Sequence, residues 1–168
     1  MTFRAMNKDP RVMAFFPSTL TDSETDSFYN RIEAEFEKYG YGLFEAEVKE
    51  SGEFIGFIGF HWAVFKAEFT PCIEIGWRLK FEAWGLGYAT EGAKACLKHG
   101  FEKLGFDKVY SFTSKLNIRS ENVMKKIGMK KAMEFAHPNI DEGNPLKQHV
   151  QYEITSACWR SASETGNN

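Results

Sequence analysis

The sequence predicts an α+β (mixed α/β) domain with a central sheet flanked by helices, and two observations lead to this class. Near the front of the chain, two stretches of alternating apolar and polar residues flank a short polar turn, which is the pattern of an antiparallel hairpin. The middle of the chain then alternates between strand patterns and helix patterns, which is typical of strand–helix–strand units. A hairpin followed by such units indicates a mixed sheet.

The first helix is expected over residues 21–39. Thr21 and Glu24 have the spacing of a capping box, in which each side chain accepts a hydrogen bond from a backbone amide at the start of the helix. Apolar residues then recur at every fourth position, at Phe28, Ile32 and Phe36. This repeat places them on one face of a helix that packs against the sheet.

Three strands follow, over residues 44–48, 54–62 and 72–80. The first two are separated by a turn and are expected to pair antiparallel. In the third strand the side chains alternate between two faces, so that Glu74 and Arg78 share the polar face.

The remaining elements alternate between helix and strand before a final strand pair. They are expected as a loop at 81–89, a helix at 90–104, a strand at 108–114, a short helix at 120–127 and strands at 130–136 and 149–155. A loop with two prolines and a glycine separates the last two strands. One domain is expected over residues 1–160, followed by a small, polar tail over 161–168 that we expect to be flexible.

Composition excludes several classes of protein. Of 168 residues, 43% are hydrophobic and 26% are charged, which is the balance of a globular chain rather than a disordered one. The 21 Lys and Arg nearly balance the 23 Asp and Glu, so the net charge is −2. A general nucleic-acid binder or a binder of anionic membranes is therefore not expected. The sequence also shows no targeting segment and no apolar run that could span a bilayer.

Cysteines and histidines lack the spacing of a metal site. The three cysteines, Cys72, Cys96 and Cys158, are scattered and form no C-x-x-C pair. Neither a disulfide framework nor a zinc site is expected, and a reducing, cytoplasmic compartment is the expected location. The four histidines also lack metal-ligand spacing, and we expect them to pack in the core or lie on the surface.

The segment with a chemical signature is the loop at 81–89, which runs into the helix at 90–104. Gly85 and Gly87 permit unusual backbone angles and the close approach of a ligand. A Gly-rich turn into a helix N-terminus points backbone N–H groups at one spot, where the helix dipole adds positive potential. The spot suits a phosphate or pyrophosphate. The alternative is a tight strand-to-helix turn that binds no ligand.

Two other phosphate-binding motifs are incomplete in this loop. A Walker A motif ends in Gly-Lys-Ser/Thr, whereas this loop reads Tyr88-Ala89-Thr90 and lacks the lysine. A Rossmann fingerprint requires Gly or Ala at position 90 and an acid at the end of the next strand. Position 90 is Thr, and Asp107 precedes that strand rather than ending it. A Rossmann-type nucleotide-binding module therefore stays an alternative with partial support.

Three longer stretches resemble the GNAT superfamily of acyl-CoA-dependent N-acetyltransferases. They are Ile73-Glu74-Ile75-Gly76-Trp77-Arg78-Leu79, Trp84-Gly85-Leu86-Gly87-Tyr88-Ala89-Thr90-Glu91 and Asn117-Ile118-Arg119-Ser120-Glu121-Asn122-Val123-Met124, with Gly128-Met129 after them. The match is closest to the branch of the ribosomal-protein N-terminal acetyltransferases. The similarity extends over residues 3–154, and it implies a GNAT-like sheet that is mixed and mostly antiparallel.

The resemblance implies how acetyl-CoA binds, without a metal. The strand before the loop would splay from the next strand, and its backbone would hydrogen-bond the pantetheine and polarise the thioester carbonyl. The loop amides would bind the pyrophosphate, and the short helix would add further contacts. The implied contacts are Trp77, Arg78, Leu79, Gly85, Leu86, Gly87, Tyr88, Ala89, Thr90, Asn117, Asn122 and Lys125.

The implied reaction is the attack of a neutral amine on a thioester, which requires a base and benefits from an acid. Glu74 is the candidate base, and its alternative role is an ion pair with Arg78. Many members of the family place a tyrosine acid where Met124 stands here. Ser120 is the nearest hydroxyl and the candidate acid, and its alternative role is to cap the short helix.

The sequence therefore predicts transfer of an acetyl group from acetyl-CoA to a primary amine by direct attack in a ternary complex. The acceptor is either a protein N-terminus or a small-molecule amine. The alternative is a non-catalytic coenzyme A-binding or sensor domain. A panel of amines offered with acetyl-CoA separates the two.

The N-terminus is short for this branch, whose members begin with a strand and the start of a helix before the segment that matches residues 3–10. We therefore expect the sheet to lack its first N-terminal strand and to leave an exposed edge, which a second copy in a homodimer would cover. Of the 16 phenylalanines, four are candidates to line the core and the acceptor cleft: Phe15, Phe16, Phe57 and Phe60.

Overall fold

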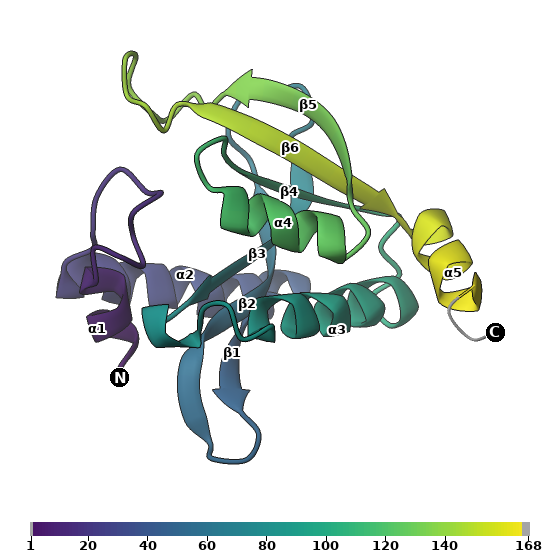
Figure 1. Cartoon of the computed structure of the whole chain (residues 1–168), viewed down its shortest axis with the longest axis horizontal. Helices are drawn as coiled ribbons and strands as arrows, with labels where there is room; N and C mark the ends of the chain where they lie inside the picture. The colour runs from purple at the N-terminus through teal and green to yellow at the C-terminus, as the bar shows by residue number, and fades with distance from the viewer. Residues whose placement is uncertain (1, 166–168) are drawn as a thin grey trace.

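The computed structural model describes residues 2–165 as a mixed sheet with helices on both faces (Figure 1). The strands are β1 (Leu43–Val48), β2 (Glu53–Ala63), β3 (Cys72–Leu79), β4 (Lys108–Ser114), β5 (Lys130–Ala136) and β6 (Gln148–Thr155). Their order across the sheet is β1-β2-β3-β4-β6-β5. Every neighbouring pair is antiparallel except β3 and β4, which run parallel. The predicted mixed, mostly antiparallel sheet is confirmed.

The helices divide between the two faces of this sheet, with α2 behind it and α3 and α4 in front in the view of Figure 1. Helix α1 packs on the same face as α2, where residues of both meet Phe57 of β2. Their bounds are α1 (Phe3–Lys8), α2 (Asp22–Tyr39), α3 (Tyr88–Glu102), α4 (Ile118–Lys126) and α5 (Ser156–Thr165), with a short 3-10 turn η1 (Phe81–Ala83). Helix α5 was not expected from the sequence, so the part of the predicted tail at 161–165 is helical. The rest of that tail, 166–168, lies outside the described residues.

The start of α2 follows the predicted capping box. The Thr21 hydroxyl oxygen accepts a hydrogen bond from the Glu24 amide at 3.2 Å, and the Glu24 carboxylate accepts one from the Thr21 amide at 2.8 Å. The helix ends at Gly40, whose φ of 73° lies in the left-handed region that favours glycine. Local chemistry alone therefore sets both ends of this helix.

The main core lies between the sheet and α3. Phe60, Ile75, Leu97 and Val109 are fully buried there. Helix α3 approaches β2 so closely that a Cβ at Gly92 would lie 2.3 Å from an Ile58 side-chain atom. This close packing fixes the start of α3 relative to the strands.

A second core lies on the other face, between the sheet and the N-terminal helices. It contains Met6, Val12, Met13 and Phe57, and the rings of Phe3 and Phe28 pack against Phe57. Phe57 and Phe60 thus occupy the two cores, as expected of core candidates. This second core anchors the loop between α1 and α2, which becomes one wall of the site described below.

Strand β1 forms one edge of the sheet, and the described chain places no strand before it. The Phe44 side chain on this edge is 38% exposed and contacts the ring of Phe36. A second copy of the chain over this edge stays a prediction. Within residues 2–165, no helix is both long and apolar enough to cross a membrane.

Candidate active site

A cleft opens in the sheet where β3 and β4 separate. The two parallel strands share a single register pair, Glu74 with Tyr110, and the Ser111 hydroxyl adds a hydrogen bond to the Ile75 carbonyl at 2.9 Å. Beyond Ile75, β3 stays paired with β2 as far as Leu79 but has no register partner on β4. The splayed strands that the resemblance implies are therefore present.

The backbone of β3 faces this cleft at alternate residues. Because successive peptide groups point to opposite sides of a strand, and the Ile75 carbonyl points to β4, the backbone groups of Trp77 and Leu79 also face the cleft. The Lys80 amide donates to a β2 carbonyl, so the backbone of Arg78 faces β2 as well. Trp77 is thus the residue that can offer its backbone to a ligand, whereas Arg78 contributes its side chain.

A cavity of about 860 Å³ fills the cleft and extends to the loop between α1 and α2. All but two of the predicted site residues line it: Glu74, Trp77, Arg78, Leu79, Gly85, Gly87, Tyr88, Ala89, Thr90, Asn117, Ser120 and Asn122. Phe15 and Phe16 line it as well. Residues from three separate sequence motifs thus meet around one cavity.

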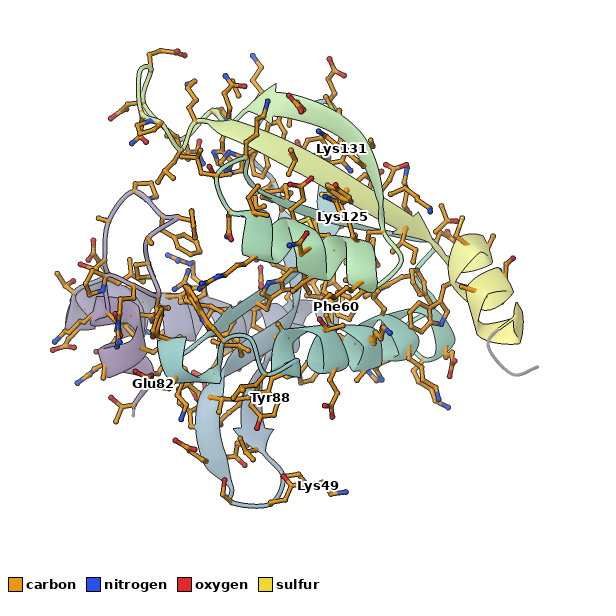
Figure 2. All side chains as sticks on the ribbon, in the orientation of Figure 1. Lys49, Phe60, Glu82, Tyr88, Lys125 and Lys131 are labelled. Carbon is orange, nitrogen blue, oxygen red and sulfur yellow. The ribbon has the colours of Figure 1, made fainter. Side chains whose placement is uncertain are left out.

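Two predicted residues do not line the cavity. The Leu86 side chain is 63% exposed at the loop surface. The Lys125 ammonium pairs with Glu121 at 3.2 Å, and Figure 2 shows Lys125 on the β6 side of α4, away from Tyr88 at the start of α3. The neighbouring Lys126 lines the cavity instead.

The loop before α3 presents backbone amides at the cavity. Gly85 and Gly87 have φ values of 76° and 91°, in the left-handed region. Gly87 is the N-cap of α3 and offers no side-chain acceptor, so the first amides of the helix are left without a capping side chain. The dipole of α3 favours negative charge at this point. An uncapped helix start that opens into a cavity suits a phosphate group.

Arg119, to which the sequence assigned no role, places a positive charge at the same cavity. The guanidinium of Arg119 lies 5.0 Å from the centre of the Trp84 ring, and Arg119 lines the cavity. The Trp84 indole in turn donates to the Leu79 carbonyl at 2.9 Å, which ties the loop to the end of β3. Arg119 lies inside the motif at 117–124, so the sequence motif already contained this residue.

Ser120 lies at the start of α4 and is not its cap. The helix begins at Ile118, and its N-cap is Asn117, whose side-chain oxygen accepts the Ser120 amide at 3.2 Å. The capping role considered for Ser120 is therefore wrong. The Ser120 hydroxyl oxygen accepts hydrogen bonds from the Asn117 amide group at 3.1 Å and from the Trp77 indole at 3.3 Å. Two donors on this oxygen leave its own proton free to be donated elsewhere.

Glu74 lies at the closed end of the cleft, opposite His61 in the register of β2 and β3. Burial raises the pKa of Glu74 to about 7, while the charge of His61 acts in the opposite direction and that of Glu35 adds to the rise. The ion pair with Arg78 that the sequence left open is not formed among residues 2–165. A carboxyl group with a pKa near neutrality in a cavity is suited to proton transfer.

His61 connects Glu74 with the surface helix α2. Its Nδ1 atom lies 2.6 Å from the Glu35 carboxylate, and its side chain is 47% exposed. Burial lowers the pKa of His61, but the hydrogen bond to Glu35 and the charges of Glu74 and Glu35 outweigh it and leave the pKa raised. His61 is therefore the exposed cross-strand neighbour of Glu74 and is paired with Glu35, an arrangement that its sequence position did not reveal.

Two further histidines line the cavity, with their rings 5.0 Å apart. Burial, helped by the charges of His149 and Lys147, lowers the pKa of His137 to about 4. Burial also lowers the pKa of His149. Both rings are therefore neutral near pH 7 and pack against Phe135, which agrees with the packing role expected for them.

Comparison with known proteins gives a consistent result. The model of the acetyltransferase (GNAT) domain family matches residues 1–130. The chain is 34% identical over 127 residues to the uncharacterised protein YkkB of Bacillus subtilis (strain 168), covering 76% of this chain and 73% of that protein. It is 29% identical over 152 residues to the uncharacterised N-acetyltransferase YnaD of the same organism, covering 90% of this chain and 84% of that protein.

A solved structure agrees with these sequence relatives. The crystal structure of a GNAT-family acetyltransferase from Bacillus anthracis matches with a TM-score of 0.74 at 27% identity, covering 92% of this chain and 87% of that chain. The family match spans most of the chain and includes the splayed strands, the glycine loop and α4. The chain therefore belongs to the GNAT acetyltransferase family, as an acyl-CoA N-acyltransferase that transfers an acetyl group.

Proposed function

We propose that this enzyme transfers an acetyl group from acetyl-CoA to a primary amine, either a small molecule or a protein N-terminus, by direct attack in a ternary complex. The observation that carries the proposal is the position of two proton-transfer groups on one cavity, with Glu74 and Ser120 on either side of the opened part of β3. Glu74, whose pKa is raised to about 7, can act as the base, and the Ser120 hydroxyl, whose proton is free, can act as the acid.

The cavity fits acetyl-CoA along its length. The uncapped amides of α3 suit the pyrophosphate, with Arg119 and Lys126 supplying positive charge on the same wall. The free backbone of Trp77 suits the amides of pantetheine, which would lie beside β3 like an added strand. When bound, the coenzyme supplies an acetyl thioester as the electrophile.

The residues of the chain then move two protons. Glu74, ionised, accepts the proton that the acceptor amine must lose, directly or through a water molecule. His61 and Glu35 give this proton a path towards solvent. The Trp77 amide stabilises negative charge on the carbonyl oxygen. Ser120 passes its hydroxyl proton to the departing sulfur while it takes up another proton from solvent, so that the thiol leaves neutral and the hydroxyl is restored. The Trp77 indole and Asn117 hold that hydroxyl in position.

A panel of amines tests the proposal against the sensor alternative. The enzyme is mixed with acetyl-CoA and with amino acids, alkylamines, polyamines or short peptides, while thiol release and the mass of the product are followed. We expect thiol release only with an acceptor, together with its acetylated product. Saturable acetyl-CoA binding without transfer to any amine would instead support a non-catalytic coenzyme A sensor.

Replacing Ser120 with Ala is expected to lower kcat by roughly 10²-fold, within the usual contribution of a general acid. Because Asn117 rather than Ser120 caps α4, the melting temperature should hardly change. The matched variant Asn117→Ala should cost about 0.5–2 kcal/mol of unfolding free energy through loss of the cap. Steady-state kinetics and thermal melting measure both effects. Full turnover by the Ser120 variant would remove the acid role.

The pH profile of kcat is expected to rise through about pH 7 and to level off above it. Glu74 acts as a base only when ionised, and its pKa is raised to about 7, so turnover falls as the pH drops below that value. Replacing His61 with Gln removes a positive charge beside Glu74 and should move this limb to higher pH. A flat profile between pH 5.5 and pH 8 would contradict the assignment of Glu74.

A further inference from the structure

We infer that the acceptor carries a carboxylate as well as its amine, and that the Arg78 side chain binds this carboxylate. The inference rests on the proposed function and names its substrate class, an amino acid in the broad chemical sense. It follows from a half-buried arginine at the cavity wall whose Nε atom is buried without a partner and which has no acidic partner within residues 2–165.

Arg78 is charged, half-buried and incompletely paired. Its Nη1 atom donates to the Asn7 side-chain oxygen at 2.7 Å, but its buried Nε atom has no hydrogen-bond partner. No carboxylate within residues 2–165 forms an ion pair with it. Burial lowers the pKa of Arg78 to about 10, which reflects the cost of keeping this charge out of water. A guanidinium nitrogen that is buried without a partner costs free energy, which an incoming anion would offset.

The surroundings of Arg78 hold its side chain in place. The rings of Phe16, Phe57 and Phe28 lie 4.3, 5.3 and 5.4 Å from the guanidinium carbon. Asn7, on α1, is fully buried and also lies within 3.5 Å of the Thr25 hydroxyl on α2. A fixed, planar guanidinium at a cavity wall is the arrangement that binds a carboxylate through two parallel hydrogen bonds.

The coenzyme does not supply the anion that would pair with Arg78. Side chains alternate along β3, so that Trp77 points to Ser120 on α4 whereas Arg78 points to the opposite face, against α1 and α2 (Figure 1). The uncapped amides of α3 and Arg119, which suit the phosphates, belong to the first of these faces. The carboxylate must therefore arrive with the other substrate.

The same face of β3 holds the proposed base. Glu74, Gly76 and Arg78 are alternate residues of one strand and line the cavity together. Gly76 has no side chain, and the nearest atom to a Cβ built there is the Glu74 carboxylate, at 3.8 Å. A ligand can therefore lie over Gly76 with its amine towards Glu74 and its carboxylate towards Arg78.

Matched pairs of acceptors test this inference. Each of a set of α- and ω-amino acids is compared with its carboxamide, which keeps the amine and removes the negative charge. In the wild-type enzyme, kcat/KM for the acid should exceed that for the amide by about 10- to 100-fold. This is the usual effect of losing a hydrogen bond between charged groups. In Arg78→Gln this preference should fall to within about 3-fold, chiefly through slower reaction of the acids.

Two variants and one inhibition assay make the test specific. Arg78→Lys keeps the charge without the planar fork and should show an intermediate preference. Arg31→Gln removes another arginine that contacts Phe28 but does not line the cavity, and it should keep the wild-type preference. If Arg78→Gln fails to fold, N-acetylated amino acids should still inhibit the wild-type enzyme about 10-fold more strongly than their amides.

The outcomes separate this inference from the proposed function. Transfer to amides as fast as to acids in the wild type, or an acid preference that Arg78→Gln retains, would overturn the role of Arg78 while acetyl transfer stands. A structural arginine would lower the rates of acids and amides equally. Acetyl-CoA binding with no transfer to any acceptor would overturn the proposed function and this inference together.

Discussion

Replacing Glu74 with Gln is expected to lower kcat by roughly 10²–10⁴-fold, with little change in the affinity for acetyl-CoA. The carboxamide has nearly the same shape as the carboxyl group but accepts no proton near neutral pH. Glu74 lies on the face of β3 that carries Arg78, whereas the uncapped amides of α3 lie on the face of Trp77. The substitution should therefore affect the chemical step and leave coenzyme binding intact.

Steady-state kinetics and calorimetric titration with acetyl-CoA measure the two quantities separately. Glu45→Gln provides the matched control, because Glu45 is an exposed residue of β1 outside the cavity. It should match the wild type in both measurements. If Glu74→Gln turned over at the wild-type rate, the base would have to be another group, and the reaction would not need the proposed proton path through His61 and Glu35.

Replacing Gly87 with Val is expected to raise the Kd for acetyl-CoA by about 10-fold or more. A Cβ at this position would meet no atom within 4 Å, so the effect does not come from a clash. It comes from the φ of 91°, which a β-branched residue adopts at a cost of about 1–3 kcal/mol. The loop relieves this strain by moving, and the first amides of α3 then no longer converge on the pyrophosphate.

Gly52→Val is the control for this strain. Gly52 lies in the turn between β1 and β2 with a φ of 67° and also has open space around it. It should lower the melting temperature much as Gly87→Val does, yet leave acetyl-CoA binding unchanged. Equal affinity of both variants for the coenzyme would show that the loop at Gly87 acts only as a turn.

The sequence predicts this fold well wherever a local pattern determines the structure. The capping box at Thr21 and Glu24 sets the start of α2, and the alternation along β3 places Glu74 and Arg78 on one face. The glycines before α3 locate the tight turn that lines the cavity, because few residues other than glycine adopt the backbone angles found there.

Errors arise where a helix starts two residues earlier than expected. Helix α4 begins at Ile118, because Asn117 rather than Ser120 supplies its cap. The cavity also contains Lys126 rather than Lys125, whose assignment depended on the family resemblance and not on the start of the helix.

Other features depend on contacts between distant parts of the chain. Arg78 and its partner Asn7 are 71 positions apart, and no local pattern relates them. Helix α5 follows β6 directly, and it is held by contacts with distant residues: the Ser156 amide donates to the Asp107 carbonyl, and the Trp159 ring packs on Phe101. Such tertiary contacts stabilise a short helix that is marginal by itself.

The central claim is that the cleft between β3 and β4 is the site of acetyl transfer, and a crystal structure with acetyl-CoA tests it most directly. We expect the pyrophosphate on the amides at the start of α3, the pantetheine along Trp77 and Leu79, and the thioester between Glu74 and Ser120. Arg78 should then remain free for the acceptor. A coenzyme bound elsewhere, or one whose phosphates contact Arg78, would contradict this assignment of the cleft.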